Sequence, residues 1–143
     1  MVNKKSGTKF ENELCKRLSE GGFWCRPMYP APDGSQPFDV MAINKKGHLY
    51  CFECKECKKD VFVFDRIENN QDICLHNLMN TYKLGKRVLF AFDTSAGTYI
   101  VTAKEVLTLY LISGYSQRKK SMNLKEIQKA GIPLEQFVKE NGV

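Results

Sequence analysis

The chain has 143 residues, a formal net charge of +6 at pH 7 and a sequence pI near 9.0. This length predicts one domain that buries about two thirds of the surface exposed by the unfolded chain. No apolar run approaches membrane-spanning length, and no apolar segment follows the first residues. We therefore expect a cytoplasmic protein with no membrane partner. The basic excess is compatible with a nucleic-acid partner but is also common in other soluble proteins.

The centre of the sequence predicts a β-hairpin formed by residues 37–43 and 49–55. Both legs are rich in apolar, β-branched and aromatic residues, as is typical of strands. Gly47 closes a three-residue loop, which predicts a type I turn followed by a left-handed glycine. This loop would pair Asn44 with His48 and so set the register of the two strands.

The hairpin carries two carboxylates and a lysine at matched positions. In the predicted register Asp39 lies opposite Glu53, with Cβ atoms about 4.5–5.5 Å apart, and Lys55 shares the face of Glu53. Carboxylates suit a hard divalent cation, and a neighbouring lysine can stabilise a phosphate or position a water. The alternative is a solvated face, but the other residues on this face are apolar: Met41, Ile43, Leu49 and Cys51.

The segment from Lys4 to Gly22 predicts a basic arm that leads into a helix. At 100° per residue, Glu11 falls inside the apolar arc of this helix. A buried carboxylate needs a cation, a metal ion or hydrogen bonds. Glu11 therefore belongs either to a core salt bridge or to the site on the hairpin.

A second helix is predicted from Asp65, where Glu68 completes a capping box, to Gly85. Gln71 lies at the centre of its apolar arc, and a buried amide must find hydrogen-bond partners. Gln71 therefore either binds backbone groups in the core or reaches the face that carries Glu53.

The six cysteines are predicted to be reduced thiols that pack in the core. Cys51, Cys54 and Cys57 have the spacing of a metal knuckle, but a strand at 49–55 would point the first two to opposite faces. No second Cys-x-x-Cys follows. We therefore expect no structural zinc.

The remaining segments predict two strands, at 86–93 and 98–101, a helix after Thr102, and two short helices at the end of the chain. Asn123 is expected to cap the first short helix, and Gly131 is expected to end it in a Schellman turn. Basic and polar residues in the arm, the first loop and the late linker are candidate DNA contacts, with a solvated linker as the alternative for the last three: Lys4, Lys5, Lys9, Ser35, Arg118, Lys119 and Lys120.

Four short motifs, taken in chain order, resemble the signature of the PD-(D/E)xK nuclease superfamily: Glu11, Pro37-Phe38-Asp39, Glu53-Cys54-Lys55 and Gln71. Within this superfamily, residues 7–14 and 38–42 are most similar to archaeal Holliday-junction resolvases. Residues 67–71, with the strands that follow, look like the bacterial and phage RecU-type resolvases. The resemblance covers about Ser6 to Ile112.

The resemblance implies an α/β fold with a mixed central β-sheet flanked by helices, as in restriction endonucleases. It also implies a homodimer that resolves four-way DNA junctions by magnesium-dependent phosphodiester hydrolysis, with Mn²⁺ as a substitute. Two departures are the Phe38 that separates proline from aspartate, and a 27–37 loop too short for the insertion of RecU-type proteins.

The resemblance further implies a role for each site residue. Asp39 and Glu53 would hold the metal together with the Cys54 carbonyl, and Glu11 would bind it through water or at a second site. Lys55 would stabilise the pentacovalent phosphate or orient the attacking water. Gln71 would hold the Lys55 side chain in position.

We expect a nuclease core with a basic arm at 1–113, and a basic linker with two short helices at 114–143 packed on the same domain. Two other functions remain open. One is a restriction-like or repair endonuclease acting on linear, flapped or other branched DNA. The other is a non-catalytic DNA-binding protein, which would not need the Asp39, Glu53 and Lys55 set.

Overall fold

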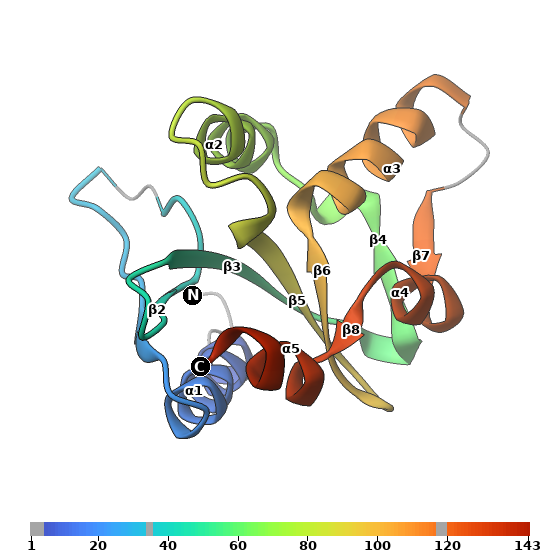
Figure 1. Ribbon diagram of the computed structural model, residues 1–143. Helices are drawn as coiled ribbons and strands as arrows, with labels where there is room; N and C mark the ends of the chain where they lie inside the picture. The colour runs from blue at the N-terminus through green and yellow to red at the C-terminus, as the bar shows by residue number, and fades with distance from the viewer. Residues whose placement is uncertain (1–4, 34–35, 117–119) are drawn as a thin grey trace.

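The computed structural model describes residues 5–33, 36–116 and 120–143 and forms a mixed α/β fold, as expected (Figure 1). The described helices are α1 (Lys5–Glu20), α2 (Asn69–Asn80), α3 (Ala103–Ser116), α4 (Leu124–Ala130) and α5 (Leu134–Asn141). The described strands are β1 (Trp24–Pro27), β2 (Val40–Ile43), β3 (Leu49–Glu56), β4 (Val61–Val63), β5 (Val88–Thr94), β6 (Gly97–Thr102), β7 (Ser121–Asn123) and β8 (Ile132–Pro133). Short 3₁₀ turns lie at η1 (Lys58–Asp60), η2 (Phe64–Arg66) and η3 (Gly85–Arg87).

The main sheet has six strands in the order β1-β2-β3-β5-β6-β8, and β4 pairs with β7 in a separate small sheet. Only the β3–β5 pair of the main sheet is parallel, so the sheet is mixed. The predicted hairpin register is confirmed. Met41 lies opposite Cys51, and the N–H of Asn44 donates to the carbonyl of His48 at 3.1 Å. Gly47 closes the turn with a φ of 82°, the left-handed conformation that the loop requires.

The sheet is covered on both faces (Figure 1), with α1 and α5 on one side and α2 and α3 on the other. Successive residues of β3 point to opposite faces. Tyr50 and Phe52 belong to the core beneath α1 and α5. Cys51, Glu53 and Lys55 therefore point to the face covered by α2, and β3 places its charged residues beside a fully formed hydrophobic core.

The predicted start of the second helix is wrong. Residues Phe64–Arg66 form η2, and α2 begins only after Glu68, whose side chain makes no capping hydrogen bond. Between η2 and α2 the backbone of Ile67 is extended, with φ −91° and ψ 110°, and its side chain is buried. Burying Ile67 in this conformation interrupts a helix that would otherwise start at Asp65.

The C-terminal elements pack on the main sheet. Asn123 and Glu126 form the capping box of α4, which confirms the predicted cap. The predicted Schellman turn at Gly131 is wrong, because this residue is extended and a Cβ on it would lie 2.3 Å from the Ile100 carbonyl oxygen. Phe137 of α5 packs edge-on against the ring of Phe52, at 5.7 Å between centroids. None of the described helices is long and apolar enough to cross a membrane.

Candidate active site

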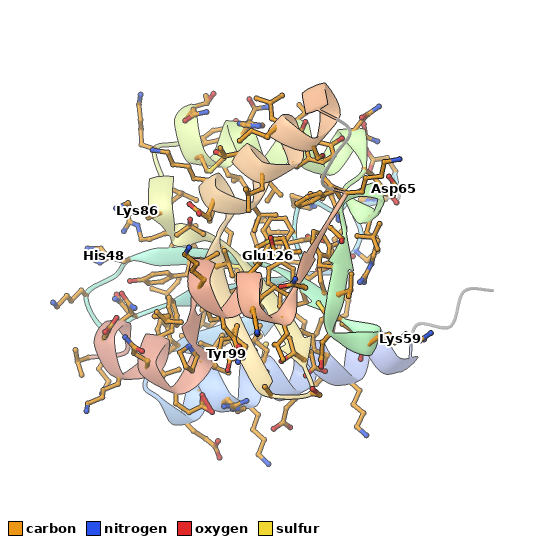
Figure 2. All side chains as sticks on the ribbon, turned by 90° about the vertical axis from the view of Figure 1, so that its right-hand side faces the viewer. His48, Lys59, Asp65, Lys86, Tyr99 and Glu126 are labelled. Carbon is orange, nitrogen blue, oxygen red and sulfur yellow. The ribbon has the colours of Figure 1, made fainter. Side chains whose placement is uncertain are left out.

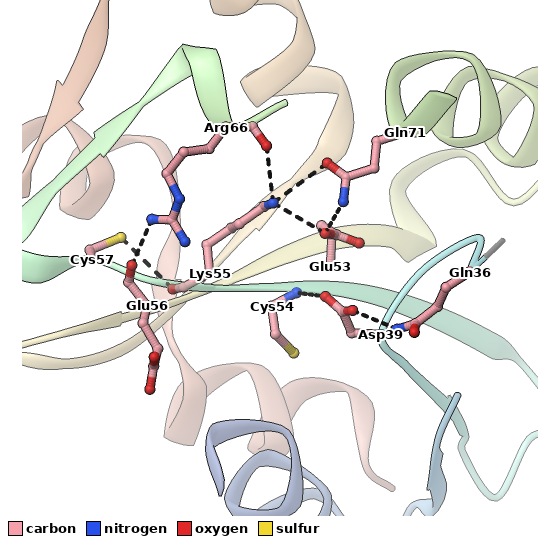
Figure 3. A network of polar contacts seen from close by, with 9 residues as sticks. All are labelled: Gln36, Asp39, Glu53, Cys54, Lys55, Glu56, Cys57, Arg66 and Gln71. Carbon is pink, nitrogen blue, oxygen red and sulfur yellow. Dashed lines mark hydrogen bonds and ion pairs between the residues drawn. The ribbon is translucent and has the colours of Figure 1, made fainter. Parts of the chain in front are cut away.

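The first carboxylate of the site lies just before β2 and is fixed by the hairpin backbone. The N–H of Asp39 donates to the Phe52 carbonyl at 2.9 Å. Oδ2 of Asp39 accepts a hydrogen bond from the N–H of Cys54 at 2.8 Å. Oδ1 of Asp39 accepts a hydrogen bond from Nε2 of Gln36, also at 2.8 Å (Figure 3). Two hydrogen bonds, one from each side, therefore hold the Asp39 carboxylate beside the middle of β3.

The second carboxylate and the lysine form a network with α2 (Figure 3). Nζ of Lys55 lies 3.3 Å from Oε2 of Glu53, and the same oxygen accepts a short hydrogen bond from Nε2 of Gln71. Lys55 also donates to Oε1 of Gln71 at 3.5 Å and to the Arg66 carbonyl at 3.2 Å. Of the two alternatives left open for Gln71, the structure shows the second: its side chain reaches the face of Glu53, and its amide contacts both Glu53 and Lys55.

Aromatic neighbours on β5 explain why this network is buried. In the parallel β3–β5 register, Glu53 pairs with Phe90 and Lys55 pairs with Phe92, and both rings are fully buried. Only 3% of Glu53 and 8% of Lys55 is exposed. Burial, followed by the charge of Asp39, raises the pKa of Glu53 to about 8, even though Lys55 acts in the opposite direction. A buried carboxylate, Glu53, is therefore held close to the half-buried carboxylate of Asp39.

Glu11 lies half-buried on α1, which covers the opposite face of the sheet. Its charge acts on the Cys54 thiol, whose pKa is raised by burial first and then by Asp39 and Glu11. The structure thus places Glu11 near Cys54, the residue of β3 that lies between Glu53 and Lys55. The nine residues drawn in Figure 3 do not include Glu11.

The donor set fits a hard divalent cation. Carboxylate oxygens are the ligands that such ions prefer, and a cation beside Asp39 and Glu53 would relieve their mutual repulsion. Within the described residues, no group of three or more His, Cys, Asp or Glu side chains forms a complete metal cage. Backbone oxygens and water would have to complete the coordination of an ion held by this pair.

The cysteine spacing has a clear geometric outcome. Cys51 and Cys54 both lie on β3 and point to opposite faces, where they neighbour Cys74 and Cys15 respectively. These two thiols therefore cannot share one metal ion. The absence of structural zinc stays a prediction.

Two contacts in the network were not predicted from the sequence. Gln36 lies in a proline-rich loop without periodicity, so no pattern indicated that its side chain binds Asp39. The carbonyl of Arg66 is a backbone group that becomes available only because η2 replaces the predicted helix start. The one local signal for the contact between Gln36 and Asp39 is that a polar residue stands three positions before the aspartate.

The predicted DNA contacts are only partly described. Lys9 and Lys120 are exposed, on α1 and just before β7. Four of the remaining candidates lie outside the described residues: Lys4, Ser35, Arg118 and Lys119. For Lys5 the structure describes the backbone but not the side chain. His48 projects from the hairpin tip (Figure 2), at the end of β3 remote from Glu53.

The mixed sheet with Asp39, Glu53 and Lys55 on its central hairpin defines a restriction-endonuclease-like core of the PD-(D/E)xK class. The family model described as "RecU: Recombination protein U" matches residues 42–140. The chain belongs to the recombination protein U family, and the match includes the C-terminal elements that no sequence motif had assigned.

The fold is also that of a solved archaeal protein. The chain is similar to Hjc of Archaeoglobus fulgidus, which is described as a Holliday junction resolvase from an archaeal hyperthermophile. The TM-score is 0.64 at 16% sequence identity, and the similarity covers 92% of this chain and 98% of Hjc. A search of curated proteins finds no match.

Proposed function

We propose that the protein is a structure-specific DNA endonuclease that resolves four-way junctions by metal-dependent hydrolysis of phosphodiesters. The observation that carries this proposal is the set formed on one hairpin by half-buried Asp39 and buried Glu53 and Lys55, with Glu53 and Lys55 hydrogen-bonded to Gln71 of α2. Membership of the recombination protein U family and similarity to an archaeal resolvase support the junction as substrate.

Asp39 and Glu53 are proposed to hold Mg²⁺ with the Cys54 carbonyl, and Mn²⁺ should substitute because it accepts the same oxygen ligands. Glu11 would bind the ion through water or at a second position. The ion, when bound, lowers the pKa of a water and polarises the phosphate. Hydrogen bonds from Gln36 and Cys54 keep both Asp39 oxygens oriented before any ion arrives.

Lys55 is proposed to stabilise the negative charge that develops on the pentacovalent phosphate, or to orient the attacking water. Its ammonium is held by the Gln71 side chain and the Arg66 carbonyl, in addition to Glu53. These oxygen acceptors fix the position of the lysine nitrogen before the substrate binds. Gln71 acts through Lys55 and Glu53 and is a positioning residue.

Two copies of this site in a homodimer would match the approximate two-fold symmetry of a junction, which needs two incisions. The basic residues named above, including Lys9 and Lys120, are proposed to contact phosphates, so recognition would depend on branch shape and backbone charge. The C-terminal elements from residue 114 are proposed to belong to the same domain as the nuclease core.

The test compares cleavage of a labelled four-way junction with duplex, flap and single-stranded controls in Mg²⁺. Asp39→Asn should lower cleavage by about 10³-fold or more and leave junction binding largely intact, because binding depends on phosphate contacts. Asp65→Asn, an exposed aspartate on η2, is the matched control. Wild-type rates in Asp39→Asn would refute the metal site. A monomer that cuts duplex and junction equally well would instead favour a restriction-like or repair endonuclease.

A further inference from the structure

A pair of thiols joins α1 to β1 on the face of the sheet opposite Glu53 and Lys55. The Cys25 thiol donates to the Cys15 sulfur, and the two Sγ atoms are 3.0 Å apart. Cys25 is 3% exposed, whereas Cys15 is half-buried and so retains access to solvent. Cys54 packs against the same hydrophobic cluster.

We propose that Cys15 and Cys25 are a peroxide-oxidisable dithiol that closes to a disulfide and fastens α1 to the edge strand β1. A disulfide bond is about 2.05 Å long, so the two sulfurs need to approach by only about 1 Å. This proposal rests on thiol geometry alone and does not depend on the nuclease activity.

The reaction needs one molecule of hydrogen peroxide as oxidant. The Cys15 sulfur attacks one peroxide oxygen, the O–O bond breaks, and the products are a sulfenic acid on Cys15 and water. The Cys25 sulfur then attacks the Cys15 sulfur and the S–O bond breaks. The departing hydroxide takes the proton of Cys25 and leaves as a second water. Two thiols are oxidised and one peroxide is reduced.

The surroundings favour this pair over the other cysteines. Cys15 is the half-buried partner, and its Sγ lies 3.0 Å from the Sγ of Cys25, which is therefore in place to resolve a sulfenic acid on Cys15. Burial raises the pKa of Cys51 to about 12 and that of Cys57 to about 11, so both stay protonated and unreactive. Peroxide can therefore reach Cys15, and the resolving thiol Cys25 already contacts it.

The proposal is tested by treating the full chain with a small excess of hydrogen peroxide. The number of thiols that can be alkylated after the treated chain is denatured should fall from six to four. Peptide mapping without reductant should find Cys15 linked to Cys25. The Tm should rise by roughly 5–10 °C, because the cross-link restricts the unfolded chain. A thiol reductant should reverse both changes.

Two variants complete the test. Cys15→Ser should abolish the cross-link, whereas Cys74→Ser, a half-buried thiol on α2, should leave it unchanged. Six alkylatable thiols after peroxide treatment would overturn the proposal. So would a cross-link that joins either residue to Cys54, or a Cys15 that accumulates sulfinic acid without any cross-link. The mapping is made on the wild-type chain, so a poorly folded variant does not decide the outcome.

Discussion

Replacing Glu53 by glutamine is expected to stabilise the metal-free protein. The pKa of Glu53 is raised from 4.5 to about 8, by burial and then by Asp39. The folded protein therefore keeps a proton that the unfolded chain releases as pH rises from 4.5 to 8. The free energy of unfolding falls across this window and stays low above it. The difference between the two pKa values corresponds to roughly 5 kcal/mol above pH 8, and to about 3 kcal/mol at pH 7.

Glutamine can occupy the site without breaking the network. Lys55 and Gln71 both contact the same oxygen, Oε2, so one amide oxygen can accept both. The amide also removes the charge that Asp39 repels. At pH 8.5 in a chelator, Glu53→Gln should raise the Tm by on the order of 10 °C. This gain in Tm should vanish near pH 4.5. Added Mg²⁺ should reduce the difference in Tm between the variant and the wild type, because it should stabilise only the wild type.

Thermal unfolding between pH 4.5 and 8.5 measures this effect, with Glu56→Gln on the same strand as the matched control. The control residue is half-buried and lies outside the carboxylate pair. A Glu53→Gln protein that is no more stable than wild type at pH 8.5 would refute the reasoning. A gain of equal size at every pH would also refute it, because the effect would then come from packing and not from the proton.

Gln71→Ala should lower cleavage by about 10–100-fold at saturating metal, whereas Asn70→Ala, a change at the exposed neighbouring residue, should have little effect. Equal cleavage rates in the two variants would contradict the positioning role of Gln71. Gln36→Ala should raise the metal concentration for half-maximal cleavage about tenfold, and an unchanged metal titration would count against its contact with Asp39. Gly131→Ala should cost about 2–4 kcal/mol in urea unfolding, since its Cβ would meet a backbone oxygen, and wild-type stability would show that the backbone yields there. Elemental analysis should find no stoichiometric zinc; one ion per chain would reverse the interpretation of the cysteines.

The hairpin register was predictable because short-range rules decide it. A three-residue loop with a left-handed glycine allows few pairings, and a period of two then assigns every side chain to a face. The need of Gln71 for a polar partner was also predictable, because a single amide on an apolar stripe must find one, but the pattern did not decide between backbone groups and the face of Glu53. These signals depend on residues close in sequence, and they located Glu53 and Lys55 on one face.

Contacts decided by distant parts of the chain were not predictable. The capping signal at Asp65 was outweighed by the burial of Ile67, whose core neighbours come from several elements. Gly131 has the sequence signature of a helix end, but its conformation is decided by the approach of Ile100 from β6. In both cases tertiary packing overrides a local preference worth about 1 kcal/mol.

The chemistry of the site depends on the same aromatic packing that stabilises the fold. Phe90 and Phe92 lie beside Glu53 and Lys55 in the parallel register and stack on one another at 5.7 Å. These rings exclude water from the face of β3 that carries the charges, and this desolvation is the largest cause of the raised pKa of Glu53. A carboxylate that is unfavourable when ionised in the metal-free protein gains most from a cation. The parallel strand β5 therefore contributes to the burial of the Glu53 carboxylate, which is proposed to hold the metal ion.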